Sequence, residues 1–143
     1  MTVIVVGRTT SCMPITTEST FAVGAALLDT LARRDLDGIA SCLAPSVRFR
    51  ALLPSRDVDL VGPDGVVAEF RRWFGSPDHR FELVDASVAG IGPRLHLRWV
   101  VRMSNAAGSR LVEQDAFLDA DGPNITTIRL LCSGFVTENR SEP

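Results

Sequence analysis

Long extended segments joined by very short polar turns fill residues 90–135, and this pattern constrains the fold more than any other part of the chain. The segments are residues 95–103, 111–120 and 125–132, and the turns between them are residues 105–109 and 121–124. Strands of this length with connections this short must pair antiparallel, because a parallel pair needs a crossover of a dozen or more residues. The C-terminal half is therefore predicted to form an antiparallel sheet.

Helical patterns precede this sheet in the sequence. Three helices are expected over residues 21–32, 37–43 and 63–74, and two short strands over residues 47–51 and 58–61. Pro63 suits the first turn of the third helix, and Gly75 suits the position just after its end. Helices that cover one face of a curved sheet enclose a pocket, so we expect one domain with a pocket between its two layers.

The composition excludes several kinds of partner. All fifteen positively charged residues are Arg, and they are scattered along a chain of net charge −2, so nucleic-acid binding is not expected. The apolar run at residues 3–6 is too short to span a membrane. The three cysteines are odd in number and lack metal-ligand spacing, which favours a reducing, cytoplasmic location without a metal or another cofactor.

We divide the chain into an N-terminal extension at residues 1–16 that is partly disordered, a domain at residues 17–135, and a polar tail at residues 136–143. Two interpretations of the first residues stay open. They are an upstream extension, with Met13 as the natural start, or they contain a short edge strand at residues 3–6.

Three stretches together resemble the SnoaL-like and ketosteroid-isomerase-like branch of the nuclear transport factor 2-like superfamily. They are residues 36–49, residues 62–70, and the hairpin from Asp115 to Ile125, in which Pro123 makes the turn one residue longer than usual. The resemblance implies an α+β fold, the cystatin-like roll, in which a cone-shaped curved antiparallel sheet wraps around three N-terminal helices. It also implies a ligand pocket at the open end of the cone and frequent dimers.

The resemblance points to Asp115 as a catalytic residue, because its position is similar to that of the hydrogen-bonding acid of ketosteroid isomerases. Glu113 lies two residues before it and so on the same strand face, and it is a candidate ligand-binding residue. The family's general base would fall at Ala51, which cannot take a proton, and the chain has no Tyr to supply the family's phenol. The alternative is that Glu113 and Asp115 lie on a solvated face or pair with Arg98 or Arg102.

Four aromatic residues are candidates for the ligand-binding walls of the pocket, namely Phe49, Phe74, Trp99 and Phe117. Each of them also fits ordinary core packing. His96 alternates in phase with Arg98 and Arg102, so we expect it on a polar outer face that meets solvent or a second copy of the chain.

Two hypotheses follow for the function. The first is a cofactor-independent isomerase, cyclase or dehydratase that uses Asp115 as acid or base on a small apolar polyketide-, steroid- or terpenoid-like molecule. The second is a non-catalytic module that binds a ligand or a partner, with the catalytic base lost at Ala51. In both cases we expect a homodimer through the outer sheet face around Arg98, Val100 and Arg102.

Overall fold

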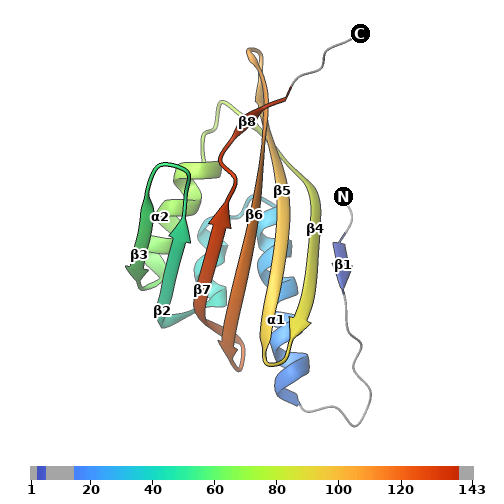
Figure 1. Ribbon diagram of the computed structural model, residues 1–143, viewed down its shortest axis with the longest axis vertical. Coiled ribbons are helices and arrows are strands. Elements are labelled where there is room, and N and C mark those ends of the chain that lie inside the picture. Colours follow the sequence, from blue (N-terminus) through green and yellow to red (C-terminus); the bar gives the residue numbers. More distant parts are fainter. Residues whose placement is uncertain (1–2, 6–14, 139–143) are drawn as a thin grey trace.

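The protein consists of one curved sheet with all of its helices on one face (Figure 1). The computed structural model describes residues 3–5 and 15–138. Most of the expected N-terminal extension and of the polar tail lies outside the described residues. The helices are α1 (Ile15–Ala32), the short 3-10 helix η1 (Asp37–Cys42) and α2 (Pro63–Phe74). The three expected helices are therefore confirmed.

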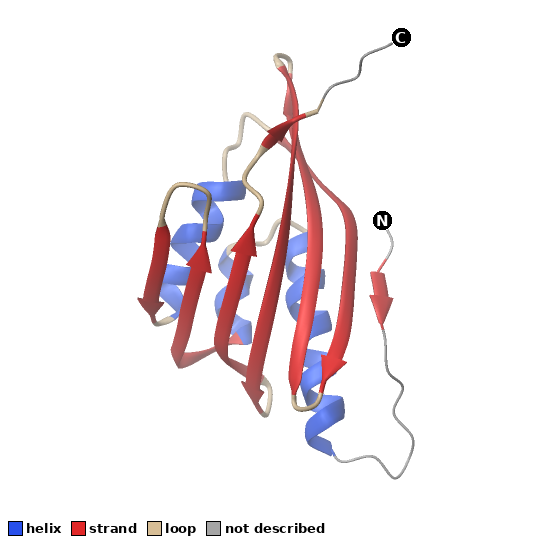
Figure 2. Ribbon diagram, in the orientation of Figure 1, coloured by secondary structure: helices blue, strands red, loops and turns tan. Residues whose placement is uncertain are grey.

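In the described residues eight strands form the sheet, in the order β1-β4-β5-β6-β7-β2-β3, with the short β8 beside β6 (Figure 2). They are β1 (Val3–Val5), β2 (Leu43–Leu52), β3 (Asp57–Val61), β4 (Arg80–Ile91), β5 (Arg94–Asn105), β6 (Gly108–Asp121), β7 (Asn124–Cys132) and β8 (Val136–Thr137). The antiparallel pairing of β4 to β7 is confirmed.

Two pairings are parallel, which the turn lengths did not predict. Strand β2 pairs with β7, and β1 pairs with β4 as an edge strand. Long connections separate the members of both pairs, so the parallel direction is sterically open to them. The second helix ends at Cys42, and Pro45 lies in β2 where the register with β7 shifts between Leu43 and Arg48.

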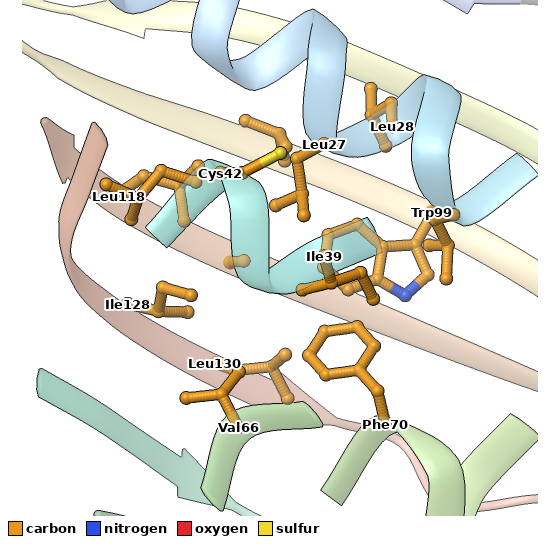
Figure 3. Packing of buried hydrophobic residues seen from close by; sticks show 14 of the residues in the cluster. Leu27, Leu28, Ile39, Cys42, Val66, Phe70, Trp99, Leu118, Ile128 and Leu130 are labelled. Carbon is orange, nitrogen blue, oxygen red and sulfur yellow. The ribbon is translucent and has the colours of Figure 1, made fainter. Parts of the chain in front are cut away.

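The core lies between the helices and the sheet, as Figure 3 shows. Leu27, Leu31, Ile39, Phe70 and Trp99 are almost entirely excluded from solvent. Aromatic rings contribute much of this packing, because α2 lays Phe70 against Trp99 with their ring centroids 6.3 Å apart. Tight burial of large apolar side chains is the main stabilising contribution to such a fold.

The other face of the sheet carries no helix in the described part of the chain (Figure 2). We call it the open face, and it corresponds to the outer sheet face of the sequence prediction. Its side chains alternate with the buried ones and include His96, Arg98, Val100 and Arg102 on β5, Glu113, Asp115 and Phe117 on β6, Arg129 and Leu131 on β7, and Arg48, Arg50 and Leu52 on β2.

Two local contacts hold loops against this frame. The Arg34 guanidinium donates to the carbonyl oxygens of Phe74, Ser76 and His79, so it ties the end of α1 to the loop between α2 and β4. After β7, Gly134 passes the β2–β3 turn with a φ of 79°, and a Cβ there would lie 2.6 Å from Cγ of Pro54.

Candidate functional site

The structure divides the six predicted site residues between opposite faces of the sheet. Glu113, Asp115 and Phe117 lie on the open face, whereas Trp99, Phe49 and Phe74 are fully buried beneath the helices. We expected all six around one enclosed pocket, and this expectation was wrong. The three buried aromatics pack in the core with 0% exposure, and the roles assigned to all six residues stay predictions.

Asp115 is half-buried at the open face rather than held in a dry chamber. Its side chain is 29% exposed, and its Oδ1 lies 2.8 Å from Nε2 of His96. The imidazole of His96 stacks on Phe117, with ring centroids 4.7 Å apart and an interplanar angle of 14°. A carboxylate that orients an imidazole is a common arrangement for general acid–base groups.

Glu113 takes part in a surface ion-pair network, as the alternative interpretation predicted. Its Oε2 accepts a hydrogen bond of 2.7 Å from Nε of Arg98, and Asp85 accepts a second one of 3.1 Å from the same guanidinium. These two acceptors raise the pKa of Arg98. Glu82 and Glu138 act on Arg102 in the same way and raise its pKa.

The most deeply buried polar side chain among the described residues is the amide of Gln114. Its side chain is fully buried, its Oε1 accepts a hydrogen bond of 2.7 Å from Nε1 of Trp99, and its Nε2 lies 3.3 Å from Sγ of Cys132. Sequence reasoning missed this residue. The signal was present in the alternation of β6. Gln114 falls on the same strand face as Val112 and Ala116, which is the apolar face, whereas Asp115 falls on the polar face.

We attribute the outward position of Asp115 to the extra turn residue. The resemblance places the family's acid ten residues before Ile125, and the turn that contains Pro123 adds one residue to that interval. Strand β7 takes up the irregularity as a register shift opposite Asp119 and Ala120. Because side chains alternate strictly along a strand, a shift of one residue moves the assignment to the opposite face.

A groove of about 450 Å³ opens on the open face where β6, β7, β2 and β3 are neighbours. Phe117, Leu131 and Leu52 give it an apolar wall, and all three are exposed large hydrophobic residues. The strand register places Leu131 between Asp115 and Leu52, so the His96–Asp115 pair borders the groove. An exposed apolar patch with polar residues around it is typical of a binding surface.

Charged side chains surround the apolar wall. Arg50 and Arg129 lie directly opposite each other on β2 and β7, and Asp57 and Asp59 line the same groove on β3. Below the groove, Asp119 accepts a hydrogen bond of 2.9 Å from Nε of Arg94, which lowers the pKa of Asp119.

The described residues contain no group of three or more His, Cys, Asp or Glu side chains that could hold a metal ion. None of the helices in this part of the chain has the length and hydropathy needed to cross a bilayer. Burial raises the pKa of the Cys42 thiol, which lies in the core and outside the groove.

Comparison with known protein families matches residues 25–126 to the SnoaL-like domain. No curated protein matches the chain. Among solved structures, AusH from Aspergillus nidulans is 16% identical with a TM-score of 0.67, and the alignment covers 85% of this chain and 88% of that one.

An NTF2-like protein of unknown function from Mesorhizobium loti is 19% identical with a TM-score of 0.64, covering 92% of this chain and 99% of that one. An LEH-like epoxide hydrolase from M. tuberculosis is 16% identical with a TM-score of 0.59, covering 84% and 86%. At these identities the three structures show a shared fold, which confirms the predicted α+β cone.

Proposed function

Because this chain belongs to the SnoaL-like domain family, we propose that it binds a small, largely apolar molecule in the open-face groove and does so without acid–base catalysis. The observation that carries this proposal is the groove itself, which gathers Phe117, Leu131 and Leu52 at the surface of a sheet face whose other side chains are mostly polar. A structural neighbour named as an epoxide hydrolase supports a small-molecule ligand. Polyketide-, steroid- and terpenoid-like compounds are the class to test.

We propose the absence of acid–base catalysis because, in the part of the chain that the structure describes, the helix-covered face of the sheet offers no side chain that is free to transfer a proton. Gln114 stands there in place of an acid, and an amide does not transfer protons at neutral pH. The buried carboxylate of Glu69 is held by Arg56 at 2.7 Å, so it is committed to an ion pair. Ala51, at the position of the family's base, is buried and apolar.

A thermal-shift screen with these compounds tests the binding proposal. Leu131→Asn places a polar group in the groove and is expected to abolish the stabilisation by any compound that binds there. Ile91→Asn is the matched control, because Ile91 is 53% exposed and Leu131 is 56% exposed, and Ile91 lies outside the groove. Ligands that still stabilise Leu131→Asn but lose their effect on Gln114→Leu would place the site under the helices and refute the proposal.

The His96–Asp115 pair favours an enzyme as a second candidate. The pair borders the groove, and Asp115 would hold the imidazole of His96 in position as a general base. In that case Asp115→Asn would leave ligand binding unchanged and remove turnover of the bound compound. Product analysis by mass spectrometry after incubation with a stabilising compound separates this candidate from simple binding.

We also propose a homodimer as the alternative use of the open face. Four acidic residues surround Arg98 and Arg102 on β5, whereas Arg48, Arg50 and Arg129 on the β2–β7 side are matched in number by Asp57, Asp59 and Asp119. A two-fold axis near β6 would place the β4–β5 side of one copy against the β2–β7 side of the other. Such a dimer covers the groove, so a dimer that Leu131→Arg dissociates in sedimentation velocity would replace the ligand proposal.

A further inference from the structure

We propose that the ligand of the open-face groove carries a carboxylate, which the guanidinium groups of Arg50 and Arg129 bind while its apolar body rests on Phe117, Leu131 and Leu52. This inference rests on the proposed function and adds the chemical class of the ligand. The evidence for it is that Arg50 and Arg129 donate no recorded hydrogen bond among the described residues, and that both line the groove.

The donors of Arg50 and Arg129 are available. The nearest carboxylate to Arg50 is Asp59, at 3.9 Å, and the nearest to Arg129 is Asp119, at 3.7 Å. Both distances exceed hydrogen-bond length. Within the described residues the structure records no hydrogen bond from either guanidinium, although each carries five N–H donors.

The arginines of β5 on the open face differ in this respect. Arg98 and Arg102 each donate hydrogen bonds of 2.7 to 3.1 Å to two carboxylates. Arg94 is likewise bonded to Asp119. In the described residues Arg48 on β2 also makes no recorded hydrogen bond, and its ion-pair partner Asp59 lies 3.7 Å away. The guanidinium groups without hydrogen bonds therefore lie on the β2–β7 side of the open face, and two of them, Arg50 and Arg129, line the groove.

The position of these two residues makes an anion favourable. Arg50 and Arg129 are direct cross-strand neighbours, and like charges directly opposite each other in a sheet destabilise it. A ligand carboxylate between them would remove this repulsion and accept charge-assisted hydrogen bonds from both sides. Binding and relief of repulsion then act in the same direction.

The remaining residues narrow the ligand to a monoanion with an apolar body. Asp57 and Asp59 line the same groove and would repel a group of higher negative charge. Phe117, Leu131 and Leu52 offer a surface to a ring or an alkyl chain. A volume of about 450 Å³ is within the range of small-molecule sites.

A matched pair of probes tests the carboxylate directly. Naphthoate and naphthamide have nearly the same shape and differ in charge, and their dissociation constants are measured by isothermal titration calorimetry and by chemical-shift perturbation. We expect naphthoate to bind about tenfold more tightly at low salt, and added salt to reduce this preference. Arg50→Gln and Arg129→Gln should each lose the preference and keep binding naphthamide.

Arg48→Gln is the control, because Arg48 lies on the same strand and face as Arg50, is similarly exposed, and lies outside the groove. Equal affinity for the two probes, or equal effects of Arg129→Gln and Arg48→Gln, would overturn the carboxylate inference and leave the binding proposal standing. If neither probe nor any compound of the screen binds a monomer, both proposals fall. If the chain is a dimer that excludes both probes, the groove belongs to the second copy and the inference is wrong.

Discussion

The buried contact between Trp99 and Gln114 supports a quantitative prediction. Gln114→Leu keeps the volume at this position approximately constant and removes the acceptor of the Trp99 indole N–H, which is fully buried. An orphaned buried donor costs about 1 to 3 kcal/mol. The substitution also removes the free-energy cost of burying the Gln114 amide, and this offsets part of the loss. We therefore expect the free energy of unfolding to fall by about 2 kcal/mol.

Urea denaturation followed by tryptophan fluorescence and by circular dichroism measures this change. Glu113→Gln is the control. Glu113 precedes Gln114 in β6 but lies on the opposite, open face, and its substitution removes only an exposed ion pair, worth at most about 1 kcal/mol. Combining Gln114→Leu with Trp99→Phe removes donor and acceptor together, so the double variant should be less destabilised than the sum of the two single variants.

Two results would refute this reasoning. If Gln114→Leu unfolds within about 0.5 kcal/mol of the wild type, the buried hydrogen bond contributes nothing measurable. If the two single changes add without coupling, the indole and the amide are not bonded to each other in solution. Either result would mean that Gln114 is not the polar centre of the helix-covered face.

Three further changes test other contacts. Arg34→Lys loses the planar fork that reaches three carbonyls, so we expect about 1 to 2 kcal/mol of destabilisation and faster hydrogen exchange in the loop after α2. Gly134→Ala should destabilise more than Gly122→Ala in urea, because both have positive φ but only the first meets a neighbour. Asp119→Asn should lower stability by about 0.5 kcal/mol at neutral pH. In a pH series this last difference vanishes as the pH falls through the native pKa of Asp119, which Arg94 holds below its ordinary value of 3.8.

The fold was predictable because its signals are local. Short turns between long alternating strands required antiparallel neighbours, and Pro63 and Gly75 marked the ends of α2 where the structure has them. The parallel pairing of β2 with β7 was not predictable in this way. It depends on contacts between residues far apart in the chain, such as Phe49 and Ile128, and no turn encodes it.

The site was less predictable, because its placement depended on one strand register. The alternation of β6 placed Glu113 and Asp115 on the same face, which was correct, but the resemblance assigned that face to the inside. The groove residues Leu52 and Leu131 gave no signal, since leucine in a strand normally indicates the core. Only the order of strands β6, β7, β2 and β3 brings them together.

The pairing of β2 with β7 also limits how far the sheet can fold during translation. Strand β2 emerges early and finds β3 at once, but its second neighbour leaves the exit tunnel only after every other long strand has been made. Until then one side of β2 exposes unsatisfied backbone groups, a state prone to mispairing with other nascent chains. Slow translation across β6 would prolong this interval, and chaperone dependence should rise with it.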